Sequence, residues 1–336
     1  MKKIIPLLIV GILILTGLGA AAIPFSKNAE IQTKQNRINT GSRGDELDQS
    51  MTSYDGVLPL GRTNIFGYYA NLSIAQSFKP QKEIQTRAQF LMARNATTLY
   101  PCYLAVRDTL TGEDLTIIAV EPDEFPLVSG TPTEEQLAWV EFNFKDIKIT
   151  PEQTYYIVVY TANITENYYW ISGNGTNIYP DGGVFLSIDD GNTWSEFTDA
   201  DGCFKTYGRN NEAPETPSID GPAKGKVGKP ITYTFVTDDP DGDEVYYCIN
   251  WSDGTPEVII GPFTSGEKAT ANHTWSEKGT YIIKAKAKNV WDKESDWATL
   301  SVTMPCSYNI PFQPFWERLF ERFPNAFPIL RHLLRY

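Results

Sequence analysis

Residues 51–210 consist of short segments in which apolar and polar residues alternate, separated by glycine, proline, asparagine and aspartate. A period of two residues predicts β-strands, and no segment has the three- and four-residue spacing of an amphipathic helix. Residues 155–160 are apolar at both sets of alternating positions, so this strand is expected in the centre of a sheet. The pattern predicts an all-β, antiparallel sandwich of jelly-roll type. The predicted strands are Ala75–Lys79, Arg87–Met92, Tyr103–Asp108, Leu115–Val120, Val140–Phe144, Tyr155–Tyr160, Tyr168–Ser172, Gly183–Ser187, Ser195–Thr198 and Cys203–Tyr207.

The alternation resumes after a proline-rich joint at residues 211–217, which predicts a second domain over residues 211–304. Within it, Tyr281, Ile283, Ala285 and Ala287 alternate with three lysines. This pattern predicts a strand with one face on a core and the other in water.

Several segments of this second domain occur in the order and at the spacing of one family. They are Gly228–Phe235, Asp238–Asp243, Trp251–Thr255, His273–Trp275 and Gly279–Tyr281. This part of the chain resembles the PKD (polycystic kidney disease) domain family. The resemblance implies a seven-stranded immunoglobulin-like sandwich that acts as a spacer or adhesion module outside cells. The indole of Trp251 stands two positions from its place in the family pattern, and a shift of two residues along a strand keeps the side chain on the same, inward face. His273 is expected to have a structural role.

The two ends of the chain differ from both domains. Residues 1–25 have a basic start, an apolar run and small residues, which predict a secretory signal cut after Ala22, with an uncleaved anchor as the alternative. Residues 26–50 are polar and aperiodic, and predict a linker. Residues 305–336 predict an amphipathic tail that lies on a membrane surface, docks on the preceding domain or has no structure. The protein is therefore expected outside the cytoplasm, secreted or at the cell surface.

Six Asn-x-Ser/Thr sequons agree with export of the chain. One of them, Asn250, falls within an apparent strand and is expected to escape modification. The predicted glycosylation sites are Asn71, Asn95, Asn163, Asn174 and Asn272.

The segment Ser187–Trp194 has the sequence of an Asp-box hairpin. We expect Asp189 to accept hydrogen bonds from amides of the turn, Gly191 to adopt a positive φ, and Trp194 to pack beneath the turn. A sialidase propeller would repeat this unit several times, whereas the chain contains it once, so sialidase chemistry is excluded.

Together with Asp108–Gly112 and Pro151–Val158, this hairpin makes the first module resemble the galactose-binding-like sandwiches of secreted, mostly prokaryotic, proteins. The resemblance implies that a ligand, often a sugar, binds in loops or on a concave sheet without catalysis. Aromatic rings pack on the apolar C–H face of a sugar, although a single ring of this kind more often fills the core. The candidate ligand-binding residues are Tyr169, Trp170, Tyr179 and Trp194.

The composition narrows the possible functions. The chain carries 41 acidic against 29 basic residues and a net charge of −12, which disfavours binding to nucleic-acid phosphates. Its two histidines, His273 and His332, leave few ways to build a hydrolytic triad or a histidine-rich metal site.

The four cysteines predict disulfides, since the chain is expected to be exported. The division into domains favours the pairs Cys102–Cys203 and Cys248–Cys306. Because Ile249 and Trp251 are expected to face inward, Cys248 should face outward, where the chain that follows Met304 could cross it.

The acidic turn of the second domain offers a candidate cation site. Asp239, Asp241 and Asp243 alternate and could present carboxylate oxygens to Ca²⁺, although the run lacks the glutamate that ends an EF-hand loop. Some PKD domains hold calcium near this turn, and a solvated acidic turn without an ion is the alternative.

These observations predict a non-catalytic, exported surface protein whose first sandwich binds a sugar or another envelope component and whose PKD-like domain is a spacer. Its expected partners are a glycan and, through the tail, a membrane surface, but no nucleic acid. One alternative is part of an extracellular glycoside hydrolase, since a catalytic pair of carboxylates cannot be excluded from sequence. Another is a structural component of a surface lattice or stalk.

Overall fold

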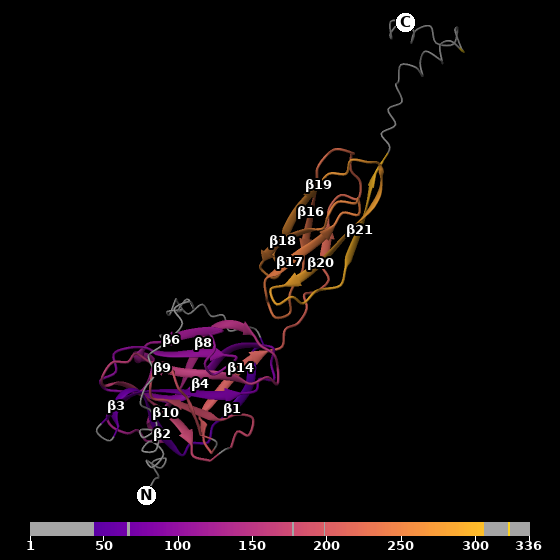
Figure 1. Ribbon diagram of the computed structural model, residues 1–336. Coiled ribbons are helices and arrows are strands. Elements are labelled where there is room, and N and C mark those ends of the chain that lie inside the picture. The colour runs from indigo at the N-terminus through magenta and orange to yellow at the C-terminus, as the bar shows by residue number, and fades with distance from the viewer. Residues whose placement is uncertain (1–43, 66–67, 177, 198, 306–321, 323–336) are drawn as a thin grey trace. The chain divides into compact units, whose positions relative to one another are not determined.

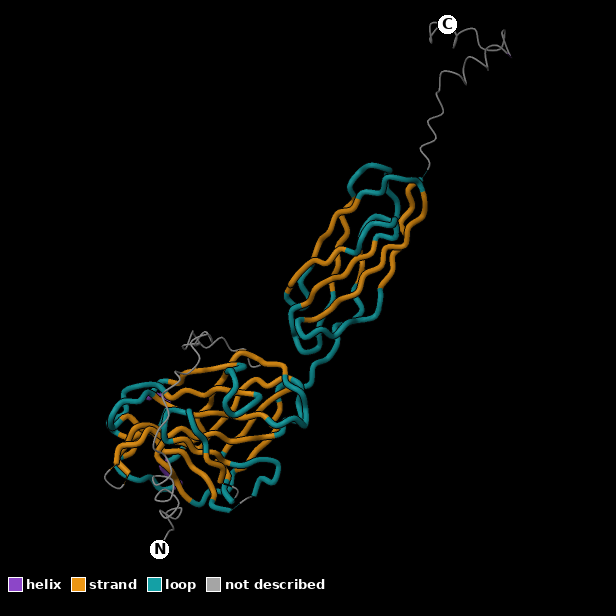
Figure 2. The backbone as a smooth tube through the Cα atoms, viewed as in Figure 1, coloured by secondary structure: helices purple, strands orange, loops and turns teal. Residues whose placement is uncertain are grey.

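The computed structural model describes residues 44–65, 68–176, 178–197, 199–305 and 322. The chain divides into two compact units, and the described residues of both consist almost entirely of strands and loops (Figure 1, Figure 2). The predicted all-β class is therefore confirmed.

The first unit comprises residues 1–212 and the second comprises residues 213–336. The predicted signal segment 1–25 and all of the predicted amphipathic tail except positions 305 and 322 lie outside the described residues. Among the residues that are described, none belongs to a helix with the length and apolar character needed to cross a membrane.

One sheet of the first unit has the strand order β6-β5-β9-β3-β11-β12. The central position of β9, predicted from its two apolar faces, is confirmed, because β9 pairs with β3 on one side and β5 on the other. The strands are β3 (Tyr68–Phe78), β5 (Cys102–Arg107), β6 (Thr116–Val120), β9 (Tyr155–Thr161), β11 (Val184–Ser187) and β12 (Ser195–Phe197).

The other sheet is organised around β4. This strand pairs with β8 along one edge and with β14 and β10 along the other. Beyond β14 the sheet continues to β1. Beyond β10 it continues to β2 and then to the first half of β3. The short strands β7 and β13 pair with β4 and β10. The strands are β1 (Glu46–Met51), β2 (Gly56–Ile65), β4 (Ile84–Asn95), β7 (Leu127–Val128), β8 (Ala138–Lys148), β10 (Asn167–Asn174), β13 (Asp201–Gly202) and β14 (Phe204–Arg209).

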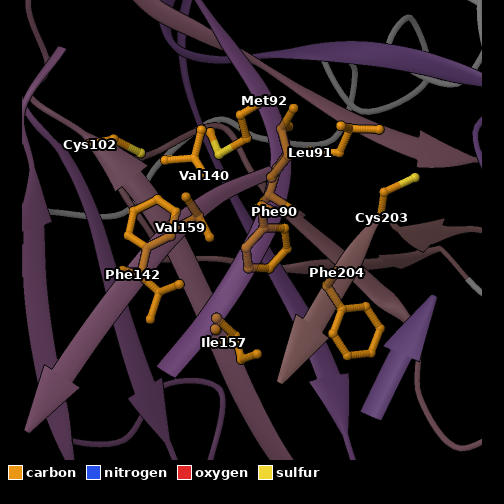
Figure 3. Close-up of a cluster of buried hydrophobic side chains, with 14 of the residues drawn as sticks. Phe90, Leu91, Met92, Cys102, Val140, Phe142, Ile157, Val159, Cys203 and Phe204 are labelled. Carbon is orange, nitrogen blue, oxygen red and sulfur yellow. The ribbon is translucent and has the colours of Figure 1, made fainter. Parts of the chain in front are cut away.

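The apolar residues that alternate along these strands form one core between the two sheets. Phe90 of β4, Phe142 of β8, Ile157 of β9 and Phe204 of β14 are almost completely buried and gather in the same cluster (Figure 3). Successive residues of a strand point to opposite sides, so the residues between these positions face away from the core. The side chains that face away decide what the sheet around β4 can bind.

The ten predicted strands of this unit all coincide with strands, but β1, β2 and the two-residue strands β7 and β13 were not predicted. The predicted linker over residues 26–50 extends too far, because β1 begins at Glu46 and pairs with β14. Its polar residues gave no alternation of their own, and its position in the sheet depends on the neighbouring strand.

The second unit is a sandwich of a three-stranded sheet, β15-β16-β19, and a four-stranded sheet, β18-β17-β20-β21. The described part of this unit thus has the seven strands that an immunoglobulin-like sandwich requires, and the predicted fold is confirmed. The strands are β15 (Ser218–Asp220), β16 (Ile231–Val236), β17 (Val245–Asn250), β18 (Val258–Phe263), β19 (Ala269–His273), β20 (Gly279–Asn289) and β21 (Ala298–Met304).

Candidate functional site

The outward side of the sheet around β4 carries aromatic and charged side chains on three neighbouring strands. The register places Gln89 of β4 between Glu141 of β8 and Lys205 of β14, and Arg87 beside Tyr207. The core residues next to these positions are Ala88 and Phe90 of β4, Val140 and Phe142 of β8, and Phe204 of β14. Trp139 is half-buried and also packs against this core. We call this surface the polar–aromatic face; it comprises Arg87, Gln89, Trp139, Glu141, Lys205 and Tyr207.

Arg87 is fixed in position on the polar–aromatic face by two carboxylates and one ring. Its Nε lies 2.8 Å from Oδ2 of Asp45, and its Nη1 lies 2.8 Å from Oε2 of Glu141. Its guanidinium lies 3.7 Å from the centre of the Tyr207 ring. Burial lowers the pKa of Arg87, but the two carboxylates raise it more, so the guanidinium stays charged.

The other polar groups of the face are linked to this ion pair. Gln89 donates from Nε2 to Glu141 at 3.2 Å and accepts at Oε1 from the hydroxyl of Tyr207 at 3.1 Å. The ammonium of Lys205 lies 3.9 Å from the centre of the Trp139 ring. The face therefore presents two aromatic rings and several hydrogen-bonding groups whose side chains are already held in place.

Two of the four aromatic residues predicted to bind a ligand belong to the core, and that prediction is wrong. Tyr169 is 0% exposed, packs against Phe125 and donates its hydroxyl to the carbonyl oxygen of Tyr100. Tyr179 is buried against Phe204. Sequence alone could not assign these rings, because Tyr169 is flanked by aromatic residues on the opposite face of its strand and Tyr179 lies in a loop without alternation.

Trp170 and Trp194 are partly exposed. Trp170 lies on β10 opposite Ala93 of β4, so it shares the outward side of this sheet with the polar–aromatic face. Its indole N–H is buried without a hydrogen-bond acceptor among the described residues. Of the four predicted residues, Trp170 is therefore the one that can extend the face.

Trp194 belongs to the Asp-box hairpin, whose predicted geometry is confirmed. Asp189 accepts hydrogen bonds from the amide and hydroxyl of Thr193, at 2.9 Å and 2.7 Å. Gly191 has a φ of 81°, and the indole of Trp194 donates to its carbonyl oxygen at 3.0 Å. These local contacts assign a structural role to Trp194.

The residues of the polar–aromatic face were not predicted, because they lie within strands and the candidate aromatic residues were those near loops. A signal was present in the alternation itself, since Arg87 and Gln89, Glu141, and Lys205 and Tyr207 occupy the polar positions of three predicted strands, and Trp139 directly precedes the second of these strands as predicted. The order of the strands in the sheet was the missing information.

The structure contradicts three of the predicted glycosylation sites. Asn71, Asn95 and Asn174 are buried, and each uses its amide nitrogen as a hydrogen-bond donor, to Asp190, Thr97 and Ser53. A glycan attached to that nitrogen would need space that neighbouring residues fill, and it would disrupt the hydrogen bond that the nitrogen donates. Asn163 and Asn272 are exposed and stay predicted sites.

The predicted disulfide between Cys102 and Cys203 is wrong. Both cysteines are free thiols, and they lie on opposite sides of the apolar cluster (Figure 3). Cys102 is on β5 of one sheet, whereas Cys203 precedes β14 in the other and donates to the carbonyl oxygen of Ser53. Burial raises the pKa of both thiols, for Cys203 to about 11, so both are protonated and unreactive near neutral pH.

The predicted disulfide between Cys248 and Cys306 is also inconsistent with the fold. Cys248 is a free thiol that lies opposite Lys286 on β20, whereas Met304 lies opposite Gly279, seven residues or about 23 Å further along the same strand. Cys306 is outside the described residues, and two residues beyond Met304 add at most about 7 Å of chain. A disulfide needs Cα atoms within about 7 Å of each other, so Cys306 of the same chain cannot reach.

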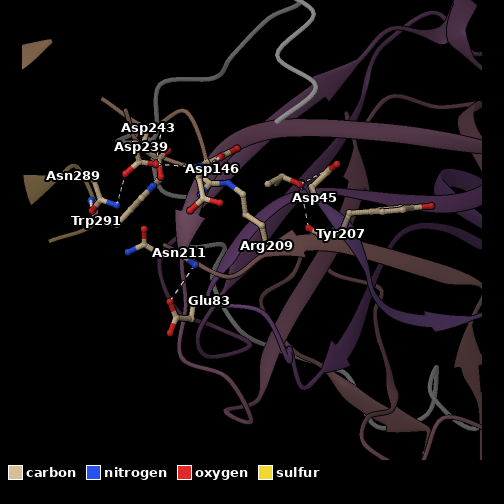
Figure 4. Close-up of polar contacts among 12 residues, drawn as sticks. Asp45, Glu83, Asp146, Tyr207, Arg209, Asn211, Asp239, Asp243, Asn289 and Trp291 are labelled. Atoms are coloured by element: carbon tan, nitrogen blue, oxygen red, sulfur yellow. Dashed lines mark hydrogen bonds and ion pairs between the residues drawn. The ribbon is translucent and has the colours of Figure 1, made fainter. Parts of the chain in front are cut away.

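In the second unit, the acidic turn after β16 brings the three predicted calcium ligands together. One carboxylate oxygen from each of Asp239, Asp241 and Asp243 lies within 4.8 Å of the others. Asp239 is buried; its Oδ1 accepts from the amides of Asp241 and Asp243 and its Oδ2 accepts from the side chain of Asn289 (Figure 4). Burial raises the pKa of Asp239, and so does the charge of Asp243. A cation here would relieve the cost of ionising a buried carboxylate.

Calcium binding at this turn stays a prediction, and it has a direct test. We expect millimolar Ca²⁺ to raise the thermal midpoint of the second unit by about 5–15 °C, given the affinities usual for extracellular calcium modules. The Asp241→Asn/Asp243→Asn variant should lose this shift, whereas the Asp292→Asn variant, altered at an exposed ion pair, should keep it. An equal shift in all three proteins would rule out the turn as the site.

The turn after β17 has a second, structural cluster. Trp251 is buried, and its ring stacks on His273 at 4.6 Å with an interplanar angle of 7°. The imidazole Nε2 of His273 lies 2.7 Å from Oδ2 of Asp253, which also accepts from Thr255. Burial raises the pKa of Asp253, but the hydrogen bonds from Thr255 and His273 lower it more, so it lies below its usual value. The geometry agrees with the structural role predicted for His273.

The sequence profile of the PKD domain family matches residues 220–304, which contain the Trp251 cluster, the acidic turn and six of the seven strands in full. Over these residues the chain belongs to the PKD domain family. The predicted resemblance is thereby confirmed for the second unit. PKD domains are typical of extracellular proteins.

Solved structures similar to this chain include the PKD domain of an M14-like peptidase from a Thermoplasmatales archaeon. The identity is 50%, the match covers 28% of this chain and 98% of that one, and the TM-score is 0.28. The PKD domain of the human VPS10 domain-containing receptor SorCS2 is 22% identical, with coverage of 30% and 77% and a TM-score of 0.21. A comparison with curated proteins finds no match to the chain.

Proposed function

We propose that the protein is an exported, non-catalytic surface protein whose first unit binds a glycan on the polar–aromatic face and whose PKD domain is a spacer. The observation that carries the proposal is the array of Trp139, Tyr207, Gln89 and Arg87 on one outward side of a sheet. Rings that pack on the C–H face of a sugar, together with fixed groups that bond its hydroxyls, are what a glycan site needs.

The fixed geometry of the face supports this proposal. Arg87 and Gln89 are held by Glu141 and Tyr207, so a ligand would lose little side-chain freedom on binding. Lys205 lies over Trp139, and the described residues include no carboxylate within 4 Å of its ammonium. Its charge is therefore free to favour a glycan that carries carboxylate or sulfate groups.

Two buried carboxylates of the first unit have contacts that fit a structural role. The side chain of Asp114 is bound by Arg107, and Asp201 accepts hydrogen bonds from the amides of Ile178 and Tyr179. A glycosidase of the common type needs two carboxyl groups that face each other across the scissile bond. These two side chains instead hold loops in place.

A glycan array followed by titration calorimetry on the best ligand tests the proposal. We expect Trp139→Ala and Gln89→Ala each to weaken binding by about tenfold or more, because each removes a ring or a bonding group of the face. The Tyr100→Ala variant, which removes an exposed ring from a loop outside the face, is the matched control and should bind as the unchanged protein does.

Two results would contradict the proposal. Equal affinity of all variants would place the ligand elsewhere, and turnover of a glycan would show a hydrolase rather than a binding module. Thermal unfolding of each variant distinguishes a lost contact from a lost fold.

A further inference from the structure

The PKD domain has two distinct ends, which the strand register defines. At one end, β21 stops at Met304, which lies opposite Gly279. The loop of residues 221–230 is next to this point, because Thr303 forms backbone hydrogen bonds with Ala223 and Gly225. We call this the tail end, because the chain leaves the domain here. The loop of residues 274–278 belongs to the same end, since the amide of Gly228 donates to the carbonyl oxygen of Trp275.

The tail end carries a group of unpaired lysines. Lys224, Lys226, Lys229 and Lys278 are all exposed, and no carboxylate of the described residues lies within 4 Å of their ammonium groups. Val227, which is 37% exposed, lies between them in sequence. The tail end therefore presents cationic side chains around an apolar one.

Four acidic groups of the described residues lie at or near the tail end. Asp253 is paired with His273, and Glu257 accepts hydrogen bonds from Cys248 and Asn250, contacts that lower the pKa of both carboxyl groups and leave them charged. Asp220, which precedes the loop of residues 221–230, and Glu277, beside Lys278, are exposed and offset part of the charge of the lysines.

The opposite end of the domain has the reverse charge. The acidic turn of residues 238–244 lies there. The backbone carbonyl oxygen of Asp238 accepts a hydrogen bond from the amide of Glu215, near the point where the chain enters the domain. Val245, which follows the turn, lies opposite Asn289, at the end of β20 far from Gly279. The domain thus has an acidic cluster where the chain enters it and four exposed lysines where the chain leaves it. An acidic surface is repelled by an anionic layer and a basic surface is attracted to it.

We propose that the tail end of the PKD domain docks on the surface of an anionic lipid bilayer. The sequence that follows this end points to the same partner, because residues 305–336 combine apolar residues at three- and four-residue spacing with arginines. Four lysines near an anionic surface strengthen attachment through the tail, whereas the acidic end of the domain is not attracted to that surface. This inference is independent of the glycan-binding proposal, because it concerns a surface of the other unit.

Co-sedimentation of the protein from residue 23 onward with lipid vesicles tests the inference. We expect binding to phosphatidylcholine vesicles that contain phosphatidylglycerol, and a loss of affinity of a hundredfold or more in the Lys224→Ser/Lys226→Ser/Lys229→Ser/Lys278→Ser variant, since each lysine contributes about fivefold. The matched control replaces Lys145, Lys268, Lys284 and Lys293 with serine, which changes the net charge equally. It should retain affinity within about fivefold, because these lysines lie outside the tail end.

The salt dependence gives a second readout, because binding through exposed charges weakens as the Debye length shrinks. Unchanged binding of the tail-end variant would overturn the inference by showing that the tail alone attaches the protein. An equal loss in the control variant would overturn it by showing that only net charge matters. Equal binding to vesicles of phosphatidylcholine alone would exclude recognition of anionic lipid.

Discussion

Replacing Trp251 with alanine is expected to destabilise the PKD domain by about 3–5 kcal/mol, which is enough to unfold a marginally stable domain. The indole is 1% exposed and contacts the rings of Tyr233, Phe235, His273 and Trp275. Its removal leaves a large cavity where the two sheets meet, and these rings cannot all shift to fill it. Urea unfolding, followed by hydrogen exchange of peptides from the second unit, measures the loss.

The matched control is Trp297→Ala, because Trp297 is 41% exposed and packs at the surface near Lys286. We expect this variant to lose less than about 1 kcal/mol. Similar losses in the two variants would mean that Trp251 is not the centre of the core. The first unit should unfold at the same urea concentration in both, which locates the effect in the PKD domain.

Replacing Asp114 with alanine is expected to destabilise the first unit by about 3–5 kcal/mol. Arg107 and Asp114 form an ion pair at 2.6 Å with side chains that are 7% and 3% exposed. Arg107 also donates to the carbonyl oxygen of Leu110, so the pair closes the turn between β5 and β6. Without Asp114 the buried guanidinium would lose the carboxylate that lies 2.6 Å from its Nε, and removing one partner of a buried ion pair costs more than the pair itself contributes. Chemical unfolding of the first unit measures this difference.

The control for this prediction is Asp181→Ala, which removes the partner of Lys79 in a pair of the first unit whose side chains are 59% and 40% exposed. An exposed pair contributes at most about 1 kcal/mol. The double variant Arg107→Met/Asp114→Leu should recover most of the stability lost in Asp114→Ala, because it removes both charges. A loss below about 1 kcal/mol in Asp114→Ala would contradict the prediction.

The alternation of apolar and polar residues predicted most of the strands because it is a local property. Val140 and Phe142 face the core for the same reason that Trp139 and Glu141 face away from it, and neighbours in sequence are enough to show this. The strand β1 was missed because its residues are polar, and it is a strand only through its pairing with β14. The register of β20 and β21 likewise excluded a disulfide from Cys248 that the count of cysteines had suggested.

The candidate functional sites likewise include contacts that the sequence predicted and contacts that it did not. The Asp-box hairpin and the acidic turn were predicted because their contacts join residues within a few positions of each other, such as Asp189 and Thr193. The polar–aromatic face joins Arg87, Glu141 and Tyr207 from strands that are far apart in sequence. Their proximity depends on the order of the strands, which the residues of any one strand do not encode.

The sequence by itself determined the all-β class, the division into two domains, the membership of the second in the PKD family and the local turns, because each depends on short-range patterns. Only the tertiary structure decided which aromatic rings fill the core, which asparagines are buried, and which cysteines are too far apart to bond. It also decided which polar side chains share the outward side of the sheet around β4 and which lysines surround the point where the chain leaves the PKD domain. These properties depend on how segments that are distant in sequence pack together. That packing is cooperative, because the apolar side chains of all the strands must fill one core without voids.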